Sequence, residues 1–281
     1  MNAKQLKPAL TAAVRAARAA GTLMRQNLHN TKTVNLATSH DIKLELDVRC
    51  QKLIERSLRA SFPNVPLLGE EGESGDVNAP YRWVVDPIDG TVNYASSIPH
   101  AAVSIALQAR DECRVTSDGK TTGRRTTSRV TPHTSHVTLV GVIYDPFQGE
   151  LWTAIRGRPA RCNGRVIHVS KRAKTSEAIV SIGFAKSKDN LRKSLPYFAR
   201  LARRVRKVRI MGSAALGLTY VAMGRFDAYV ERGISLWDIA AGGLIVERAG
   251  GAFWTEPVSG HLKYRMVASN GWLDRQVPRP A

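Results

Sequence analysis

Unbroken apolar runs along the chain predict several buried β-strands. Trp83–Val85 precedes two aspartates three residues apart, and an uninterrupted apolar run is typical of a strand covered on both faces. VPLLGEEG at 65–72 predicts a short strand leading into a turn, and AAVSIALQA at 101–109 predicts another strand. VTLVGVIYD and ELWTAI, separated by PFQG, predict a β-hairpin, and FDAYVE predicts a later strand.

Apolar residues spaced three and four apart predict helices between these strands. The first predicted helix has a buried side formed by Leu6, Leu10, Ala13, Val14 and Ala17. Its basic residues lie mostly outside: Lys4, Lys7, Arg15 and Arg18. Further helices are predicted from about Asp47 to Ala60, over SAALGLTYVAMG, and over WDIAAGGLIVERAGG, which Gly250 and Gly251 end. Interspersed helices and strands indicate a mixed α and β class.

A basic helical region is predicted from GFAKSKDN onward, and residues 195–209 carry two stripes at helical spacing. The apolar stripe consists of Leu195, Phe198, Leu201, Val205 and Val208. The basic stripe consists of Arg200, Arg203, Arg204 and Lys207. One interpretation is the solvated face of a core-packed helix. The other is a binding surface for RNA or acidic lipid, which no interleaved aromatic residue or nucleic-acid motif supports.

Residues 111–136 are rich in Thr, Ser, Arg and Gly and poor in large apolar residues. Such a stretch cannot offset its ordering entropy by burial, so we expect a flexible basic surface insertion. His133 and His136 form an HxxH pair within it, but no third or fourth ligand is nearby, which disfavours a metal site there.

The formal charge of +19 over 281 residues is the compositional outlier. It favours anionic partners, such as phosphorylated metabolites, nucleic acid or anionic membranes, without choosing among them.

Three cysteines without a CxxC pair argue against a disulfide framework. With no predicted membrane span or signal peptide, we expect a cytoplasmic protein. Residues 1–40 lack acidic residues, as a mitochondrial transit peptide would, but their periodicity favours a helix.

Carboxylates are concentrated where strands should end or helices begin. They are Asp41, Asp47, Glu70, Glu71, Asp86, Asp89 and Asp238. Carboxylate and carbonyl oxygens suit Mg²⁺ or Mn²⁺ rather than zinc. Gly90 and Thr91 follow as the start of a helix, where free amides favour an anion. The pattern predicts metal-assisted phosphoryl transfer to water. Motifs for P-loop, nucleophile-elbow and dinucleotide chemistry are absent.

Three motifs together resemble the inositol monophosphatase family: GEEG at 69–72, DPIDGTVN at 86–93 and WDIAAGGLIVERAGG at 237–251. The resemblance implies one α+β domain over residues 1–281, layered α-β-α-β-α, with pseudo-halves of about 1–145 and 146–281. It also identifies AVRAARAAGTLMRQNL as the family's first helix. The insertion at 111–136 is outside the family pattern, and relatives are commonly homodimers.

The resemblance also assigns roles. Glu70 would bind metal and orient the attacking water, Asp86 would bridge two metals, and the Ile88 carbonyl would complete the first site. Asp89 and Asp238 would hold a second metal, with two or three Mg²⁺ ions in all, Mn²⁺ as a possible substitute and Li⁺ as an inhibitor. Thr91 would work with Asp47 on the water. The phosphate and substrate contacts would be Gly90, Thr91, Gly212, Ser213, Ala214, Glu231 and Asp238.

Other acidic and aromatic residues have a structural interpretation. We expect Glu71 to be a surface acid or to lie beside the ligands, Asp41 to be a cap or turn residue, and Trp237 to pack and fix Asp238. Leu46 stands where relatives usually have a small polar residue, which affects the positioning of the Asp47–Thr91 pair. Tyr94 replaces the commoner Phe.

The implied activity is a Mg²⁺-dependent phosphomonoesterase acting on myo-inositol monophosphate or a similar small polyol or sugar phosphate. Alternatives within the superfamily are fructose 1,6-bisphosphate, histidinol phosphate and 3′-phosphoadenosine 5′-phosphate. A hypothesis of another class is a basic RNA-associated protein, with or without catalysis, which the charge supports and the motifs do not.

Overall fold

The computed structural model describes residues 3–37, 42–110, 136–184 and 188–280. Six α-helices and fifteen strands are found in this part of the chain. The helices are α1 (Ala3–Asn27), α2 (Glu45–Arg59), α3 (Thr91–Ala95), α4 (Lys188–Ala202), α5 (Ala214–Ala222) and α6 (Leu236–Arg248), with a 3-10 turn at Thr175–Glu177.

The strands form three sheets. A two-stranded ribbon contains β1 (Val34–Ala37) and β2 (Ile42–Leu44). An eight-stranded sheet has the order β10-β9-β8-β7-β6-β5-β3-β4, formed by β3 (Leu67–Gly69), β4 (Gly72–Ser74), β5 (Tyr81–Asp89), β6 (Ala102–Arg110), β7 (His136–Asp145), β8 (Glu150–Ile155), β9 (Arg161–Cys162) and β10 (Arg165–Val166). A five-stranded sheet has the order β12-β11-β13-β15-β14, formed by β11 (Ile179–Ile182), β12 (Lys207–Arg209), β13 (Ala228–Ser235), β14 (Ala252–Pro257) and β15 (Lys263–Ser269).

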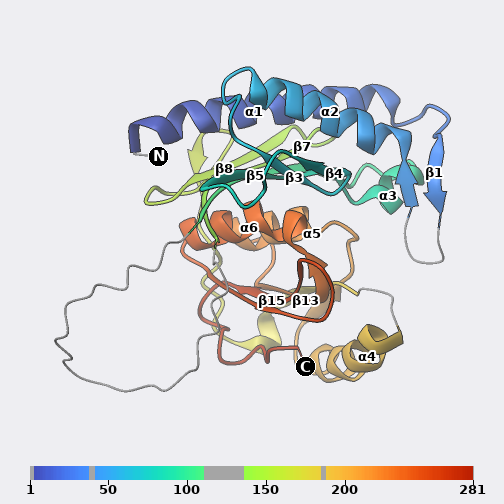
Figure 1. Ribbon diagram of the computed structural model, residues 1–281. Helices are drawn as coiled ribbons and strands as arrows, with labels where there is room; N and C mark the ends of the chain where they lie inside the picture. Colours follow the sequence, from blue (N-terminus) through green and yellow to red (C-terminus); the bar gives the residue numbers. More distant parts are fainter. Residues whose placement is uncertain (1–2, 38–41, 111–135, 185–187, 281) are drawn as a thin grey trace.

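Five layers are stacked in the molecule (Figure 1). Helices α1 and α2 cover one face of the eight-stranded sheet, α5 and α6 lie between the two larger sheets, and α4 covers the far face of the five-stranded sheet. The α-β-α-β-α layering and the α+β class expected from the sequence are confirmed.

Strand β5 shows why its sequence is an unbroken apolar run. Trp83 and Val85 belong to the core formed with α1 and α2, whereas Val84 between them belongs to the core formed with α5 and α6. Because successive side chains of a strand point to opposite faces, a strand between two helical layers needs apolar residues at every position. The strand leads directly to Asp86 and Asp89 at the junction of the layers.

Other predicted elements are also found. The helix from about Asp47 to Ala60 is α2, and the first helix is α1, with Leu6, Ala13 and Ala17 buried. The hairpin is formed by the antiparallel strands β7 and β8. β14 and β15 have no counterpart among the predicted elements.

The prediction of one helix over residues 195–209 is confirmed up to Ala202 and wrong beyond it. Helix α4 ends at Ala202, and Lys207–Arg209 is the strand β12, paired in parallel with β11. Leu195, assigned to the apolar stripe, is 54% exposed, whereas Val205 is buried. Pairing with β11 satisfies backbone groups of this edge strand, so a contact distant in sequence outweighs the local helical pattern.

Several sequence predictions lie outside the described residues. These are the insertion at 111–135, His133, Asp41 and Cys113; His136 is the first residue of β7. Cys50 and Cys162 are buried free thiols. In the described part of the chain, each helix is too short or too polar to cross a bilayer.

Candidate metal and phosphate site

The end of β5 places two carboxylates next to a tight turn. Asp86 pairs with Ser104 of β6 and Asp89 with Ala102, and the register shifts between them. The Asp86 Oδ1 atom accepts the backbone N–H of Ile88 at 3.0 Å, which fixes the carboxylate across the turn. Gly90 follows with φ of 96°, and a Cβ there would lie 3.0 Å from the His100 carbonyl oxygen. Only glycine therefore fits without displacing backbone.

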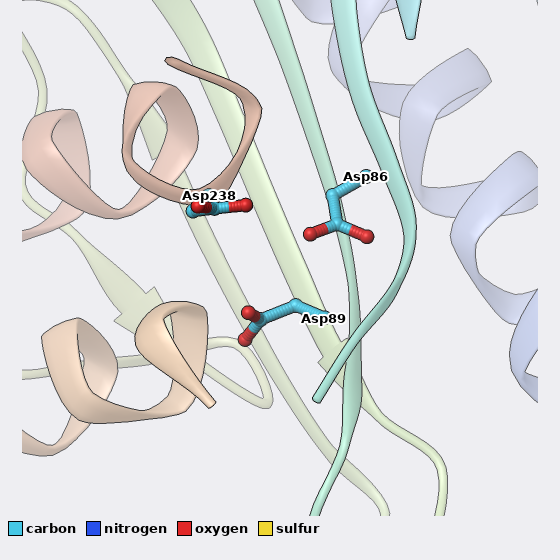
Figure 2. A group of neighbouring side chains, drawn as sticks. All are labelled: Asp86, Asp89 and Asp238. Carbon is cyan, nitrogen blue, oxygen red and sulfur yellow. The ribbon is translucent and has the colours of Figure 1, made fainter. Parts of the chain in front are cut away.

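The third carboxylate comes from the other end of the chain. Asp238 is in the first turn of α6, where its Oδ2 atom accepts the N–H of Ser235 at 2.9 Å. Oxygen atoms of Asp86, Asp89 and Asp238 lie within 4.8 Å of one another, and Figure 2 shows the three groups facing a common centre. Trp237, beside Asp238, packs on the core, and its carbonyl accepts the Ser104 hydroxyl, which agrees with the predicted packing role.

Asp89 is bound by the start of α5. Its carboxylate accepts the Ser213 hydroxyl and the N–H groups of Ala214 and Ala215, the latter two at 3.2 and 2.8 Å. Helix N-termini stabilise negative charge, so this contact partly offsets the cost of burying the Asp89 carboxylate, which is only 7% exposed. Ser213 and Ala214, predicted as substrate contacts, thus also position a predicted metal ligand.

Burial and mutual repulsion perturb the acidic groups of the site. Burial, and then the charges of Asp238 and Asp47, raise the pKa of Glu70 to about 8. Burial raises the pKa of Asp86 well above its usual value, with the charges of Glu70 and Asp89 adding to the effect. Burial raises the pKa of Asp89 to about 7, against the opposing effect of its Ser213 hydrogen bond. Divalent cations would relieve this repulsion, and a donor set made only of oxygen fits Mg²⁺ or Mn²⁺.

A pocket of about 420 Å³ contains these groups. Its walls come from both larger sheets and the helices between them. They include all the predicted site residues except Asp47: Glu70, Asp86, Ile88, Asp89, Gly90, Thr91, Gly212, Ser213, Ala214, Glu231 and Asp238. Glu231 accepts the Tyr229 hydroxyl, and its burial raises the pKa of Glu231 to about 8.

Asp47 lies outside this lining, in the first turn of α2. Its Oδ2 atom accepts the N–H of Leu44 at 2.7 Å, while its charge reaches Glu70. The Thr91 hydroxyl donates to the Ile88 carbonyl at 2.9 Å. Leu46 is buried in the core between α2 and the sheet, so its apolar side chain serves packing. Joint action of Asp47 and Thr91 on a water stays a prediction.

Sequence reasoning missed several lining residues. The end of β11 contributes Ser181, and Gly183 and Phe184 follow it. The mouth carries two exposed apolar side chains, Val92 at 44% and Ile210 at 60%. The apolar run IVSI before Gly183 was the available signal for a strand ending at the site.

Asn93 joins the two walls of the pocket. Its side-chain amide donates to the carbonyl of His100 at 3.0 Å and to that of Met211 at 2.9 Å. His100 leads into β6 of the eight-stranded sheet, whereas Met211 precedes α5. Asn93 is in the DPIDGTVN motif, but Met211 is 118 residues away, so this contact could not be predicted from the motif.

Fold and site define a layered α+β protein with an acidic, oxygen-rich pocket between its two larger sheets. The inositol monophosphatase family profile matches residues 5–116 and 133–274, and the chain belongs to this family. Residues 117–132 fall outside the match.

Relatives agree with this assignment over most of their length. A protein named Nus factor SuhB from Pseudomonas aeruginosa is 37% identical over 254 residues, covering 88% of this chain and 84% of the relative. The crystal structure of the extragenic suppressor protein SuhB from Bartonella henselae has a TM-score of 0.81 at 29% identity, with 95% of each chain covered. The structure of inositol monophosphatase from Anabaena has a TM-score of 0.76 at 32% identity, covering 97% of this chain and 94% of the other.

Proposed function

We propose that the protein is a Mg²⁺-dependent phosphomonoesterase that hydrolyses myo-inositol monophosphate or a similar small polyol or sugar phosphate. The observation that carries the proposal is the convergence of the Asp86, Asp89 and Asp238 carboxylates within 4.8 Å in a pocket of about 420 Å³. Family membership supports the same class of chemistry. Fructose 1,6-bisphosphate, histidinol phosphate and 3′-phosphoadenosine 5′-phosphate are alternative substrates.

Each residue has a part in the proposed reaction. Asp86, Asp89, Asp238, Glu70 and the Ile88 carbonyl would hold Mg²⁺. When bound, Mg²⁺ neutralises the clustered acids, lowers the pKa of water and stabilises charge on the leaving oxygen.

The remaining groups act on water and substrate. Glu70 orients the attacking water, and Thr91 with Asp47 receives its proton. The backbone amides of Gly90 and Thr91 bind the phosphate, because unpaired N–H groups at a helix start favour an anion. Glu231, bound to Tyr229, accepts a hydroxyl of the leaving alcohol.

Phosphate release from the four named substrates, measured with Mg²⁺ and with EDTA, tests the proposal. We expect Mg²⁺-dependent release from at least one substrate, and inhibition by Li⁺. Asp86→Asn should abolish it, while Glu71→Gln, next to Glu70 but outside the pocket lining, should retain it. Release that is absent from all four, or equal in both variants, would contradict the assignment.

We propose RNA association as a second function. It is supported by the name Nus factor borne by relatives, by the net charge of +19, and by a cluster of exposed cations. Arg200, Arg203 and Arg204 line a hollow of about 250 Å³ with Tyr197, Leu201 and Pro278. Three cationic side chains around one hollow favour an anion.

A matched pair of variants tests this second function. Arg203→Gln/Arg204→Gln should weaken single-stranded RNA binding about tenfold and reduce its salt dependence. Arg18→Gln/Arg25→Gln removes the same charge from exposed positions on α1, on the opposite side of the molecule (Figure 1). Equal weakening by both pairs would leave only a general charge effect. A homodimer and a cytoplasmic location stay predictions, the first of which a solution mass measurement checks.

A further inference from the structure

A lysine lies beside the acidic pocket although it was not among the predicted site residues. Lys263 is the first residue of β15, and the antiparallel register places it opposite Ser235, the last residue of β13. Ser235 is also the residue before α6, whose first turn contains Asp238. Strand pairing therefore brings an ammonium group to the point where a predicted metal ligand begins its helix.

Two consecutive hydrogen bonds connect Lys263 with Asp238. The Lys263 Nζ atom donates to the Ser235 hydroxyl at 2.5 Å, and the Ser235 N–H donates to Asp238 Oδ2 at 2.9 Å. The charge of Lys263 acts on both sides of the pocket, since it lowers the pKa of Asp238 and that of Glu231 against the raising effect of burial.

Hydrogen bonds around the turn before β15 fix the backbone at Lys263. The Val258 N–H donates to the Lys263 carbonyl at 3.0 Å, and the Leu236 N–H donates to the Leu262 carbonyl at 3.0 Å. Gly260 approaches so closely that a Cβ there would lie 3.1 Å from Lys263 Cγ. The Lys263 side chain is partly buried, and its hydrogen bond to Ser235 holds the ammonium group near the carboxylates.

We propose that Lys263 is a positioning residue with a resident positive charge, which stabilises the metal-free site and weakens its affinity for Mg²⁺. The proposal rests on the proposed metal site. A fixed cation near the carboxylates offsets part of their repulsion before a metal binds. The same cation repels an incoming divalent ion, and partial burial limits the screening of that repulsion by salt. The expected result therefore has opposite signs for fold stability and for metal affinity.

Lys263→Gln is the central variant, because glutamine keeps a polar N–H donor but has no charge. Its Mg²⁺ dissociation constant, measured by calorimetry without substrate, should be about five- to tenfold lower than that of the unaltered protein. Its Tm in EDTA should be lower. Lys263→Arg should restore both values, and Ser235→Ala, which removes the hydrogen bond but keeps the charge, should change Mg²⁺ affinity less than twofold. Lys52→Gln, at an exposed position of α2, controls for net charge.

A purely structural lysine predicts the reverse, since a loosened α6 would weaken Mg²⁺ binding. Unchanged or weaker affinity in Lys263→Gln would therefore overturn the proposal. If the variant unfolds in EDTA, Mg²⁺ should restore its fold and raise its Tm by more than in the unaltered protein; failure to do so would also overturn it. Phosphate release measured in parallel separates the two proposals. If the unaltered protein releases no phosphate, the phosphatase proposal is contradicted, whereas the Mg²⁺ affinities still test the role of Lys263.

Discussion

Helices α2 and α6 begin in the same way but serve the site differently. In each, an aspartate in the first turn accepts the N–H of the residue before the helix: Leu44 N–H to Asp47 at 2.7 Å, and Ser235 N–H to Asp238 at 2.9 Å. Each helix follows directly on a strand. The shared hydrogen bond fixes a carboxylate where the helix dipole stabilises negative charge.

Position in the layers makes the difference between them. Helix α6 lies between the two larger sheets, so Asp238 faces Asp86 and Asp89 in the pocket. Helix α2 lies in the outer layer, and Asp47 reaches the site through its charge on Glu70. The residues before the helices differ too, because Leu44 is buried in the core while Ser235 bonds to Lys263. The same aspartate-to-backbone hydrogen bond therefore occurs at both helix starts, and the packing of each helix decides whether its carboxylate enters the pocket.

The largest expected effect is on the rate of phosphate release, after substitution of Asp238 at the start of α6. Asp238→Asn should lower the rate of phosphate release by about a thousandfold or more, because it removes a charged metal ligand worth several kcal/mol in the transition state. The asparagine oxygen can still accept the Ser235 N–H, so the fold should survive. Tm in EDTA should not fall, since one repelling charge is gone. A rate within tenfold of normal would show that Asp238 does not hold the metal.

Asp47→Asn should have a smaller effect, about a hundredfold on the rate, as expected for a group that assists proton transfer. Mg²⁺ affinity measured by calorimetry should stay within about threefold, because Asp47 lies outside the pocket lining. A loss as large as that of Asp238→Asn, or strongly weakened Mg²⁺ binding, would remove the distinction between the two helix starts.

The residues before the helices allow a comparison of stability alone. Leu44→Ala should reduce the free energy of unfolding by about 2–5 kcal/mol, because Leu44 is 1% exposed and its truncation leaves a cavity. Ser235→Ala should cost about 1 kcal/mol, the usual cost of a lost helix cap. Urea denaturation at saturating Mg²⁺ measures both, and equal costs would contradict the packing difference.

The smallest expected effect is the change that each aspartate variant makes to the pH dependence of the metal-free protein. Glu70 has a pKa of about 8 in the fold against an ordinary 4.5, so the folded state keeps a proton that the unfolded chain releases between these values. The free energy of unfolding in EDTA should therefore fall as pH rises from about 4.5 to about 8. Both aspartate variants should flatten this slope, Asp238→Asn more than Asp47→Asn, because the charge of Asp238 acts more strongly on Glu70. Stability that rises over this range would contradict the assignment.

Local patterns predicted the parts of the site that are close in sequence. The strand at 83–85, the turn through Pro87 and Gly90, and both helix starts follow from the periodicity and residue types of short segments. The three family motifs then implied the metal ligands, and the structure brings Asp86, Asp89 and Asp238 together.

Contacts between distant segments could not be predicted in this way. Strand β12 forms because β11 lies beside it, and the helical pattern of residues 195–209 does not indicate this pairing. The bond between Asp89 and Ser213 spans 124 residues. Lys263 reaches the site through strand register, which a shift of one residue would reverse.

The two hydrogen bonds of Asn93 have a consequence for the order of folding events. They connect the wall before β6 with the loop before α5, so the complete pocket exists only after the two halves of the chain have docked. A partly folded chain then offers no site that Mg²⁺ can occupy with full affinity. Since ligands stabilise only the states that bind them, the ion should leave the folding rate unchanged and slow unfolding. Mg²⁺ would extend the lifetime of the native protein without guiding the chain toward it.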